Sequence, residues 1–198
     1  VLNNKVNVRI MKRTILLIGF LFVTALLFGK VKGVKHVVLI GLDGWGAYSV
    51  PQADMPTVRI MMKGGAYTLE SRSVLPSSSA CNWASMIMGA SPEIHGFTTW
   101  GSKKPEIPSR ELSPYGLFPT VIGLLRDQRP DAEIGYVFEW DGMQYLCERE
   151  AVNHFAHVPP VEEQSDPIVQ DAVQYIREKK PTFMMIAFNN PDEVGHKY

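Results

Sequence analysis

The sequence predicts an α/β sandwich with a mainly parallel central sheet. Two observations favour this class. Short apolar runs alternate along the chain with helix-like segments, and the run at residues 36–41 lacks the polar alternation of a strand that faces water. The chain has 198 residues, of which 45% are apolar, so it can bury a sizeable core and corresponds to one domain or most of one.

The first half of the chain alternates strand-like and helix-like segments. In order, we expect a strand at residues 36–41, a helix at 56–63, a strand at 66–74, a helix at 82–88 and a return of the chain at 90–96. The first strand is apolar without alternation, which is typical of a strand buried on both faces. The first helix has Pro56 near its first turn and Gly64-Gly65 at its end, and Gly89 ends the second helix.

The second half resumes this alternation after a long loop. Gly and Pro recur through residues 97–116, which therefore resist a regular assignment, and loops of this length are often functional lids. We then expect a helix at 118–127, a strand at 133–138, a helix at 166–179 and a strand at 182–188. Asp166 can cap the helix at 166–179, with Pro167 at its first position.

The N-terminal residues have the composition of an export segment. Residues 1–10 precede the expected start, and residues 11–33 combine a short positive region at Met11-Lys12-Arg13 with an apolar stretch of about signal-peptide length. The catalytic-domain region is then 34–198, and the protein is expected in the periplasm or cell envelope. A retained membrane anchor stays open as an alternative, because residues 27–30 lack a small-x-small cleavage pattern.

Charge and cysteine content restrict the function classes. Residues 1–33 hold six Lys or Arg and no acid, which leaves 14 bases against 20 acids in the remainder. This negative balance gives no support to nucleic-acid binding, which usually shows a basic stripe. The two cysteines, Cys81 and Cys147, either pair or stay as buried thiols.

Acidic and imidazole side chains follow the ends of the first and last expected strands. Asp43 comes directly before a turn at Gly44, and Asp192 lies four residues before His196. Ligands gather outside the carboxyl ends of parallel strands, so these groups should meet in one crevice, with Pro191 and Gly195 shaping a loop that joins the last two. The structural alternatives are a turn-capping Asp and a satisfied surface His.

A run of serines precedes the helix expected at 82–88. Ser79 lies just ahead of that helix, whose free amides attract anions, and a hydroxyl there can act as a metal-activated nucleophile. Asn82, one turn later, can donate its amide to a non-bridging oxygen. Carboxylate, imidazole and hydroxyl groups together suit a cation such as zinc. The alternative is that the serines only cap the helix.

Four motifs, taken in order, carry a family resemblance. They are Leu42-Asp43-Gly44, residues 76–82, residues 88–96 and residues 192–196. Together they resemble the type I phosphodiesterase/nucleotide pyrophosphatase family of the alkaline phosphatase superfamily, over about residues 36–198. The resemblance implies an alkaline-phosphatase-like three-layer sandwich and a hydrolase of small phosphate esters that uses two divalent metal ions, zinc in the first instance.

The resemblance also implies roles for single residues. Asp43 would bind one metal, Ser79 would face that metal as the nucleophile and form a covalent phospho-serine, and Asn82 would hold a phosphoryl oxygen. Asp192 and His196 would bind the other metal. His95 belongs to the motif at 88–96 as a structural residue, and we expect it to hold the turn after the helix.

The sequence departs from the family pattern in its remaining ligands. The family needs a further Asp-His pair and one more His, and His36, His154 and His157 do not match them, the last two being expected in an irregular segment. We therefore expect a fragment of a longer reading frame, an expectation that the start at Val1 favours. On its own it should bind zinc poorly and catalyse little.

Three other functions compete with this prediction. A sulfatase would need x-Pro-x-Arg after its nucleophile, whereas Ala80-Cys81-Asn82-Trp83 follows Ser79. An alkaline-type phosphate monoesterase usually has Asp-Ser-Ala and a phosphate-binding Arg, so Ser78-Ser79-Ala80 with Asn82 favours diesters. A non-catalytic envelope binding protein on the same fold stays open, and Trp83, Trp100 and Trp140 would form its binding surface. Asp141 and Tyr145 near Trp140 are further candidates for substrate contact.

Overall fold

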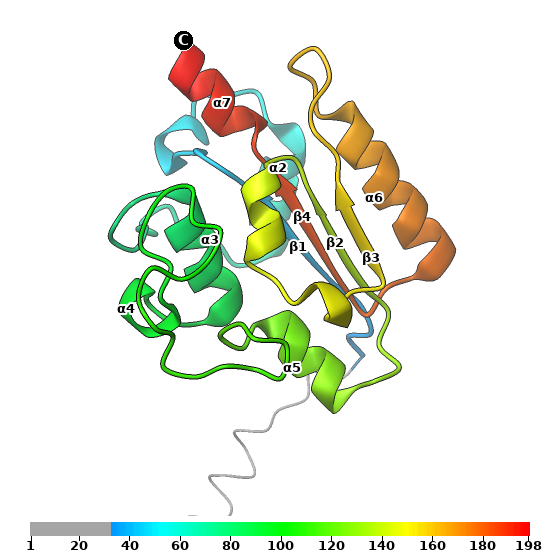
Figure 1. Cartoon of the computed structure of the whole chain (residues 1–198). Helices are drawn as coiled ribbons and strands as arrows, with labels where there is room; N and C mark the ends of the chain where they lie inside the picture. Colours follow the sequence, from blue (N-terminus) through cyan, green and yellow to red (C-terminus); the bar gives the residue numbers. More distant parts are fainter. Residues whose placement is uncertain (1–32) are drawn as a thin grey trace, which may run out of the picture. The chain divides into compact units, whose positions relative to one another are not determined.

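A four-stranded parallel sheet organises residues 36–198 (Figure 1). The computed structural model describes residues 33–198, so the predicted export segment lies outside the described residues, apart from Gly33 at its end. The strands are β1 Val37–Leu42, β2 Ile134–Phe138, β3 His154–His157 and β4 Phe183–Phe188, in the order β1-β4-β2-β3. Each neighbouring pair is parallel, which confirms the predicted α/β class with a parallel sheet.

Helices connect the strands. The α-helices are α2 Pro56–Gly64, α3 Ser79–Met88, α4 Pro92–His95, α5 Val121–Gln128, α6 Asp166–Lys179 and α7 Asn190–Lys197, and the 3₁₀ turns are η1 Ala47–Ser49, η2 Asp141–Tyr145 and η3 Arg149–Ala151. Among residues 33–198, no helix is long and apolar enough to cross a membrane.

Two apolar clusters cover the two faces of the sheet. Alternate β4 residues point to opposite faces, as the pleat of a strand requires, so Met185 joins the larger cluster and Met184 the smaller one. The larger cluster includes residues of α3 and α5, and the smaller one residues of α6. Figure 1 shows α6 on the other side of the sheet from α3 and α5. The carboxyl ends of the central strands are thereby fixed between two layers of helices.

The predicted burial of β1 on both faces is wrong. Val38 and Ile40 are 45% and 51% exposed, although their register partners on β4, Met184 and Ile186, are buried against α6. The difference arises because α6 covers β4 and β2 but does not reach β1. Leu39, on the opposite face, packs against the larger cluster.

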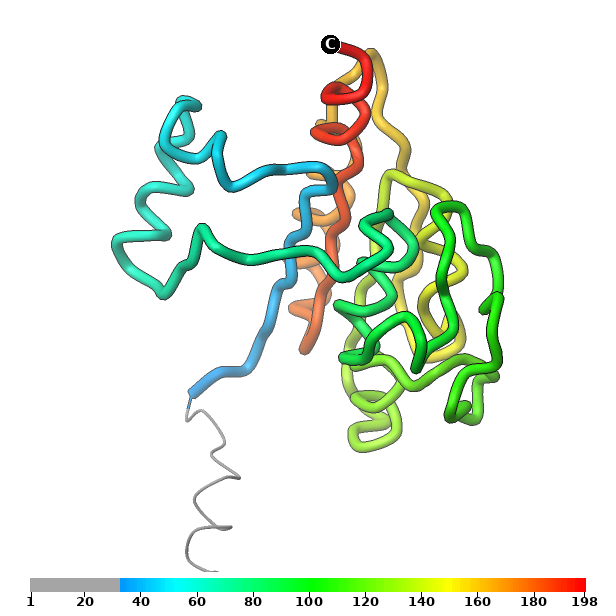
Figure 2. The backbone as a smooth tube through the Cα atoms, turned by 90° about the vertical axis from the view of Figure 1, so that its left-hand side faces the viewer, coloured from blue at the N-terminus to red at the C-terminus, as the bar shows by residue number. Residues whose placement is uncertain are grey.

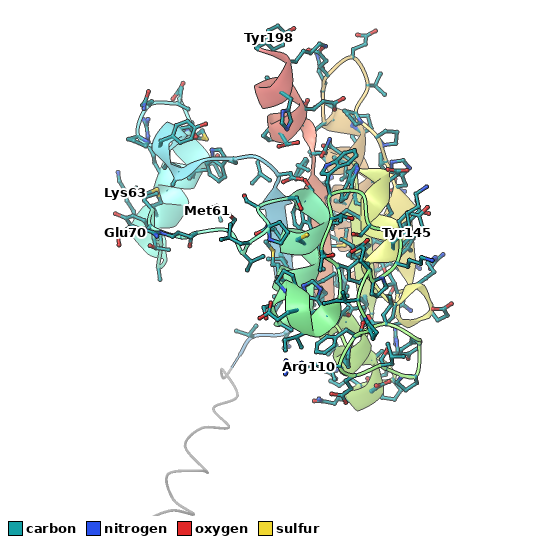
Figure 3. The ribbon with its side chains drawn as sticks, turned by 60° about the vertical axis from the view of Figure 1, so that its left-hand side comes forward. Met61, Lys63, Glu70, Arg110, Tyr145 and Tyr198 are labelled. Carbon is teal, nitrogen blue, oxygen red and sulfur yellow. The ribbon has the colours of Figure 1, made fainter. Side chains whose placement is uncertain are left out.

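The strand predicted at residues 66–74 is also wrong. These residues form no regular element, and those from 63 to 73 are all exposed. A strand needs the backbone of a neighbour to pair with, and this segment belongs to an arm, residues 47–72, that stands away from the sheet (Figure 2). Met61 and Lys63 of α2 and Glu70 beyond it project from this arm in Figure 3. Helix α2, predicted at 56–63, is confirmed, but it has no buried residue.

Several predicted element bounds shift. Helix α3 begins at Ser79, three residues before the predicted start, and α5 begins at Val121 because the Thr120 hydroxyl accepts from the amides of Ile122 and Gly123 as its cap. Asp166 is the first residue of α6 instead of its cap, which is Ser165. The segment predicted as irregular before Pro159 contains β3.

Other predictions about the fold are confirmed. Residues 97–116 contain no helix or strand, as expected of a long loop. Both cysteines are buried and free, so the thiol alternative holds. His95 is fully buried and holds the turn after α3 and α4, since its Nδ1 accepts from the amide of Phe97 (3.1 Å) and its Nε2 lies 2.9 Å from Ser85 Oγ.

The burial of His95 predicts an acid-sensitive fold. Desolvation lowers the pKa of its imidazole below the usual value, with the nearby Glu93 opposing the shift. The unfolded chain takes up a proton near pH 6.5 that the folded chain resists, so this group's contribution to stability is lost as the pH falls below about 6.5. We expect the melting temperature to fall between pH 7.5 and pH 5.5, and to fall less steeply in His95→Gln. Equal slopes in the two proteins would contradict this role.

Candidate functional site

The carboxyl ends of β1 and β4 lie side by side. Leu42 is paired in register with Phe188, and the amide of Asp43 donates to the Phe188 carbonyl at 2.8 Å. Asp43 therefore leaves β1 at the level where the chain leaves β4 towards α7. This is the edge at which the sequence predicts the site.

The carboxylate of Asp43 is held from two sides. Trp83 Nε1 donates to Oδ2 at 3.1 Å, and the amide of Gly44 donates to Oδ1 at 3.0 Å. Trp83 belongs to α3 and is only 5% exposed, so the first strand and the first core helix fix this oxygen pair together. Burial also removes Trp83 from the surface proposed for a binding protein.

Helix α7 packs directly on the turn after β1. Gly44 has φ +66°, and a Cβ built on it would lie 2.6 Å from Asp192 Cα and 2.8 Å from Asp192 Oδ1. Real atoms do not approach so closely, so only glycine allows this contact. The approach brings Asp192 next to the residue that follows Asp43.

Asp192 and His196 lie on a helix instead of the predicted loop. Pro191 in the first turn, two acids near the amino end and His196 and Lys197 near the carboxyl end all favour α7, and they outweigh the cost of Gly195. The i,i+4 spacing still brings the two side chains together, with His196 Nε2 3.6 Å from Asp192 Oδ1.

Ser79 is the first residue of α3. Its side chain is half-buried, and Ser78 before it is the N-cap. Within residues 33–198 no group hydrogen-bonds to Ser79 Oγ, whereas Ser78 Oγ donates to Cys81 Sγ at 3.1 Å. The hydroxyl of Ser79 thus stands at the positive end of a helix with its oxygen available.

Asn82 has a structural position that its spacing did not predict. Its Oδ1 accepts from the amide of Val74 at 2.8 Å, and its Nδ2 donates to the carbonyls of Ser78 at 3.0 Å and Pro76 at 3.4 Å. The amide predicted to hold a phosphoryl oxygen here connects residues 74–78, the serine segment, to α3.

All five predicted site residues line one cavity of about 600 Å³. They come from the turn after β1, the start of α3 and helix α7, three parts of the chain that are distant in sequence. The lining is Leu42, Asp43, Gly44, Trp45, Gly46, Ser73, Ser77, Ser78, Ser79, Asn82, Trp100, Asp192 and His196.

The electrostatics of this cavity suit a cation. Burial raises the pKa of Asp192, the negative charge of Asp43 raises it further, and His196 opposes the shift. Two carboxylates that repel each other, with an imidazole beside them, are ligands that a divalent ion prefers. In the part of the chain that the structure describes, however, no three His, Cys, Asp or Glu side chains are grouped closely enough to hold a metal. The predicted donors fit a partial ligand set.

The other histidines do not complete this set. His154 pairs with Asp171 at 2.7 Å, and His157 Nε2 donates to the Glu139 carbonyl at 2.8 Å. His36 Nδ1 lies 2.8 Å from the carbonyl of Pro181, before β1 and β4 begin. Among the described residues, His196 is the histidine that lines the cavity.

Aromatic residues at the cavity were only partly foreseen. Trp45 was not singled out, although it follows Asp43 by two residues. Trp100 lines the cavity, is 65% exposed and stacks on Trp140 with ring centroids 6.2 Å apart.

Glu139, directly after β2, was also missed, and the same strand-end reasoning that selected Asp43 would have found it.

This chain matches one protein family and is similar to several solved structures. A family model described as type I phosphodiesterase / nucleotide pyrophosphatase matches residues 37–198. Among curated proteins no match is found. The phosphonoacetate hydrolase of Sinorhizobium meliloti, solved in complex with phosphonoacetate, is similar in structure, with a TM-score of 0.58 and 20% identity over 83% of this chain and 48% of that one.

Two mammalian structures are similar to the same degree. Murine ectonucleotide pyrophosphatase/phosphodiesterase 5, an inactive form in complex with AMP, matches with a TM-score of 0.58 and 15% identity, covering 82% of this chain and 45% of that chain. The human protein matches with a TM-score of 0.58 and 16% identity, covering 81% and 45%. The chain spans about half the length of these structures, and the similarity confirms its alkaline-phosphatase-like fold.

Proposed function

Because the chain belongs to the type I phosphodiesterase / nucleotide pyrophosphatase family, we propose that the complete protein hydrolyses small phosphate esters with Ser79 as its nucleophile. One observation carries this proposal: Asp43, Ser79, Asp192 and His196 line the same cavity at the carboxyl ends of β1 and β4. The parallel strands bring Asp43 and Asp192 to one edge of the sheet, and the presence of Ser79 and His196 in the same cavity supports a shared chemical role.

In the proposed reaction Ser79 attacks phosphorus. Its hydroxyl loses its proton to solvent, Oγ forms a bond to phosphorus, and the ester oxygen on the opposite side departs with the bonding electron pair. Water then attacks phosphorus and breaks its bond to Oγ, which releases the phosphate monoester that remains of a diester, and Oγ takes a proton from the water to restore Ser79. The free amides at the start of α3 favour the negative charge of the phosphoryl group throughout.

Three side chains supply metal ligands in this proposal. Asp43 would hold one divalent ion together with Ser79, and Asp192 with His196 would hold a second. Such ions, zinc in the first instance, lower the pKa of a hydroxyl and neutralise the charge on the entering and leaving oxygens. Asp43 is already oriented by Trp83 and Gly44, so its oxygens need little rearrangement to bind.

The aromatic residues of the cavity support diesters over monoesters as substrates. Trp45 and Trp100 line the cavity together with Ser77, Ser78 and Ser79. A monoester offers these aromatic side chains only its leaving group, whereas a diester presents a second organic group as well. The substrates proposed here are therefore small diesters or pyrophosphate-linked compounds. Asn82 contributes by holding the serine segment in place.

Substrate and chelation experiments on the complete protein test the proposal. We expect bis-p-nitrophenyl phosphate to be hydrolysed faster than p-nitrophenyl phosphate, with activity lost on treatment with a chelator and restored by zinc. Metal analysis of the untreated protein should find bound divalent metal. Activity that survives complete removal of metal, or no hydrolysis of any ester by a metal-loaded protein, would contradict the proposal.

The expected location remains part of the proposal. The apolar stretch within residues 11–33 supports export to the periplasm or cell envelope. Fractionation of cells that express the complete protein tests it: we expect the protein outside the cytoplasm, and a protein confined to the cytoplasm would contradict export.

A further inference from the structure

Glu139 is a buried carboxylate that contacts the start of α7. It follows β2 directly and is 3% exposed. Its Oε2 accepts from the amide of Asn189 at 2.6 Å and from that of Asn190 at 3.0 Å. These residues are the N-cap and the first residue of the helix, so a negative charge lies where the helix dipole is positive.

Apart from its contact with the turn at Gly44, helix α7 is held by few other interactions. None of its residues is buried, and the Asn189 side chain makes no capping hydrogen bond. At its outer side it is tied to a loop, where Asn190 Nδ2 donates to the Glu163 carbonyl at 2.6 Å and Lys197 pairs with the Glu163 carboxylate. Helices are normally oriented by an apolar face, so the direction of α7 depends on its contact with the Gly44 turn and on polar contacts at its ends.

The backbone of Glu139 is itself fixed. Its amide donates to the Ala187 carbonyl of β4 at 3.0 Å, and its own carbonyl accepts from His157 at 2.8 Å. Through its backbone and its side chain, Glu139 connects β2 with β4 and with α7. It can therefore fix the position, relative to the sheet, of the helix that carries Asp192 and His196.

The burial of the second carboxylate oxygen of Glu139 destabilises the folded state. Among the described residues, Oε1 is buried without a hydrogen-bond partner. Burying a charged oxygen without a partner opposes folding, so stability alone does not explain a carboxylate here. Proteins keep such destabilising groups where the groups position a functional site.

We propose that Glu139 is a positioning residue that fixes α7, and with it Asp192 and His196, against the carboxyl end of the sheet. The inference rests on the proposed function for its consequence, which is metal binding. Its structural part, the anchoring of α7, stands on the hydrogen bonds above and is tested separately.

The chain offers a matched control in Glu148. This residue is also a buried carboxylate, 1% exposed, that contacts the start of a helix: it accepts from the amide of Thr120 at 3.0 Å and from the Thr120 hydroxyl. The helix it serves is α5, which contributes no residue to the cavity. Loss of either carboxylate should lower stability, but only one should affect the site.

The experiment compares Glu139→Gln and Glu139→Ala with Glu148→Gln in the complete protein. Hydrogen exchange of the peptide covering residues 189–198 is measured without metal, and zinc affinity by competition with a chromogenic chelator. We expect faster exchange in this peptide for both Glu139 variants, and about tenfold weaker zinc binding in Glu139→Ala, the size of loss seen when the partner of a metal ligand is removed. Glu139→Gln, which keeps one acceptor oxygen, should lose less.

Glu148→Gln should instead speed exchange around residues 119–128 and leave zinc affinity unchanged. Unchanged exchange at residues 189–198 in a folded Glu139→Gln protein would overturn the positioning role, as would equal losses of zinc affinity in the Glu139 and Glu148 variants. If the unaltered protein binds no zinc, the proposed function fails while the exchange result still decides whether Glu139 anchors α7.

Discussion

Ser79→Ala is expected to reduce diester turnover by the complete protein on the order of 10³-fold or more, because it removes the attacking oxygen. Zinc content should stay largely intact, since Asp43, Asp192 and His196 are untouched. Steady-state rates with bis-p-nitrophenyl phosphate, measured beside metal analysis, check both halves of this expectation.

Two variants serve as controls for Ser79→Ala. Ser77→Ala alters the same segment of the same cavity without changing the start of α3, and it should keep turnover within a few-fold of normal. Ser79→Thr retains a hydroxyl and should recover part of the activity. Near-normal rates in Ser79→Ala would show that another group attacks phosphorus.

Gly44→Ala is expected to have the second large effect, because a methyl group there must displace Asp192. The left-handed backbone at φ +66° adds strain of about 1–2 kcal/mol for any other residue. The displacement adds to this strain and separates the end of β1 from α7. We expect zinc affinity and kcat/KM to fall at least tenfold, measured by chelator competition and by diester hydrolysis.

Gly89→Ala separates strain from displacement. Gly89 has φ +62° at the end of α3, but a Cβ there meets no atom within 4 Å. Both variants should therefore lose similar stability from backbone strain, while Gly89→Ala keeps zinc affinity and turnover. Equal functional losses in the two variants would mean that contact between Gly44 and Asp192 is not what shapes the site.

The convergence of the cavity residues was predictable because it depends on strand ends. Parallel strands place their carboxyl ends at one edge, so apolar runs that end just before Asp43 and Asp192 indicate a shared crevice whatever the intervening chain does. The structure places both there. The helical form of α7 could also have been predicted from Pro191, the acids of its first turn and the bases of its last, had Gly195 been given less weight.

The errors concern features that depend on distant partners. Whether β1 is buried depends on how far α6 extends over the sheet, which the sequence of β1 does not encode. Whether residues 66–74 form a strand depends on the presence of a neighbouring strand to pair with. The role predicted for Asn82, donation to a phosphoryl oxygen, stays a prediction; in the structure its side-chain amide donates to the carbonyls of Ser78 and Pro76.

The most direct test is anomalous diffraction at the zinc edge from crystals of the complete protein grown with zinc. We expect density in the cavity within about 2.0–2.2 Å of a carboxylate oxygen of Asp43, and a second position beside Asp192 and His196. Zinc bound only elsewhere, with the oxygens of Asp43 and Asp192 left free of metal in a folded protein, would contradict it.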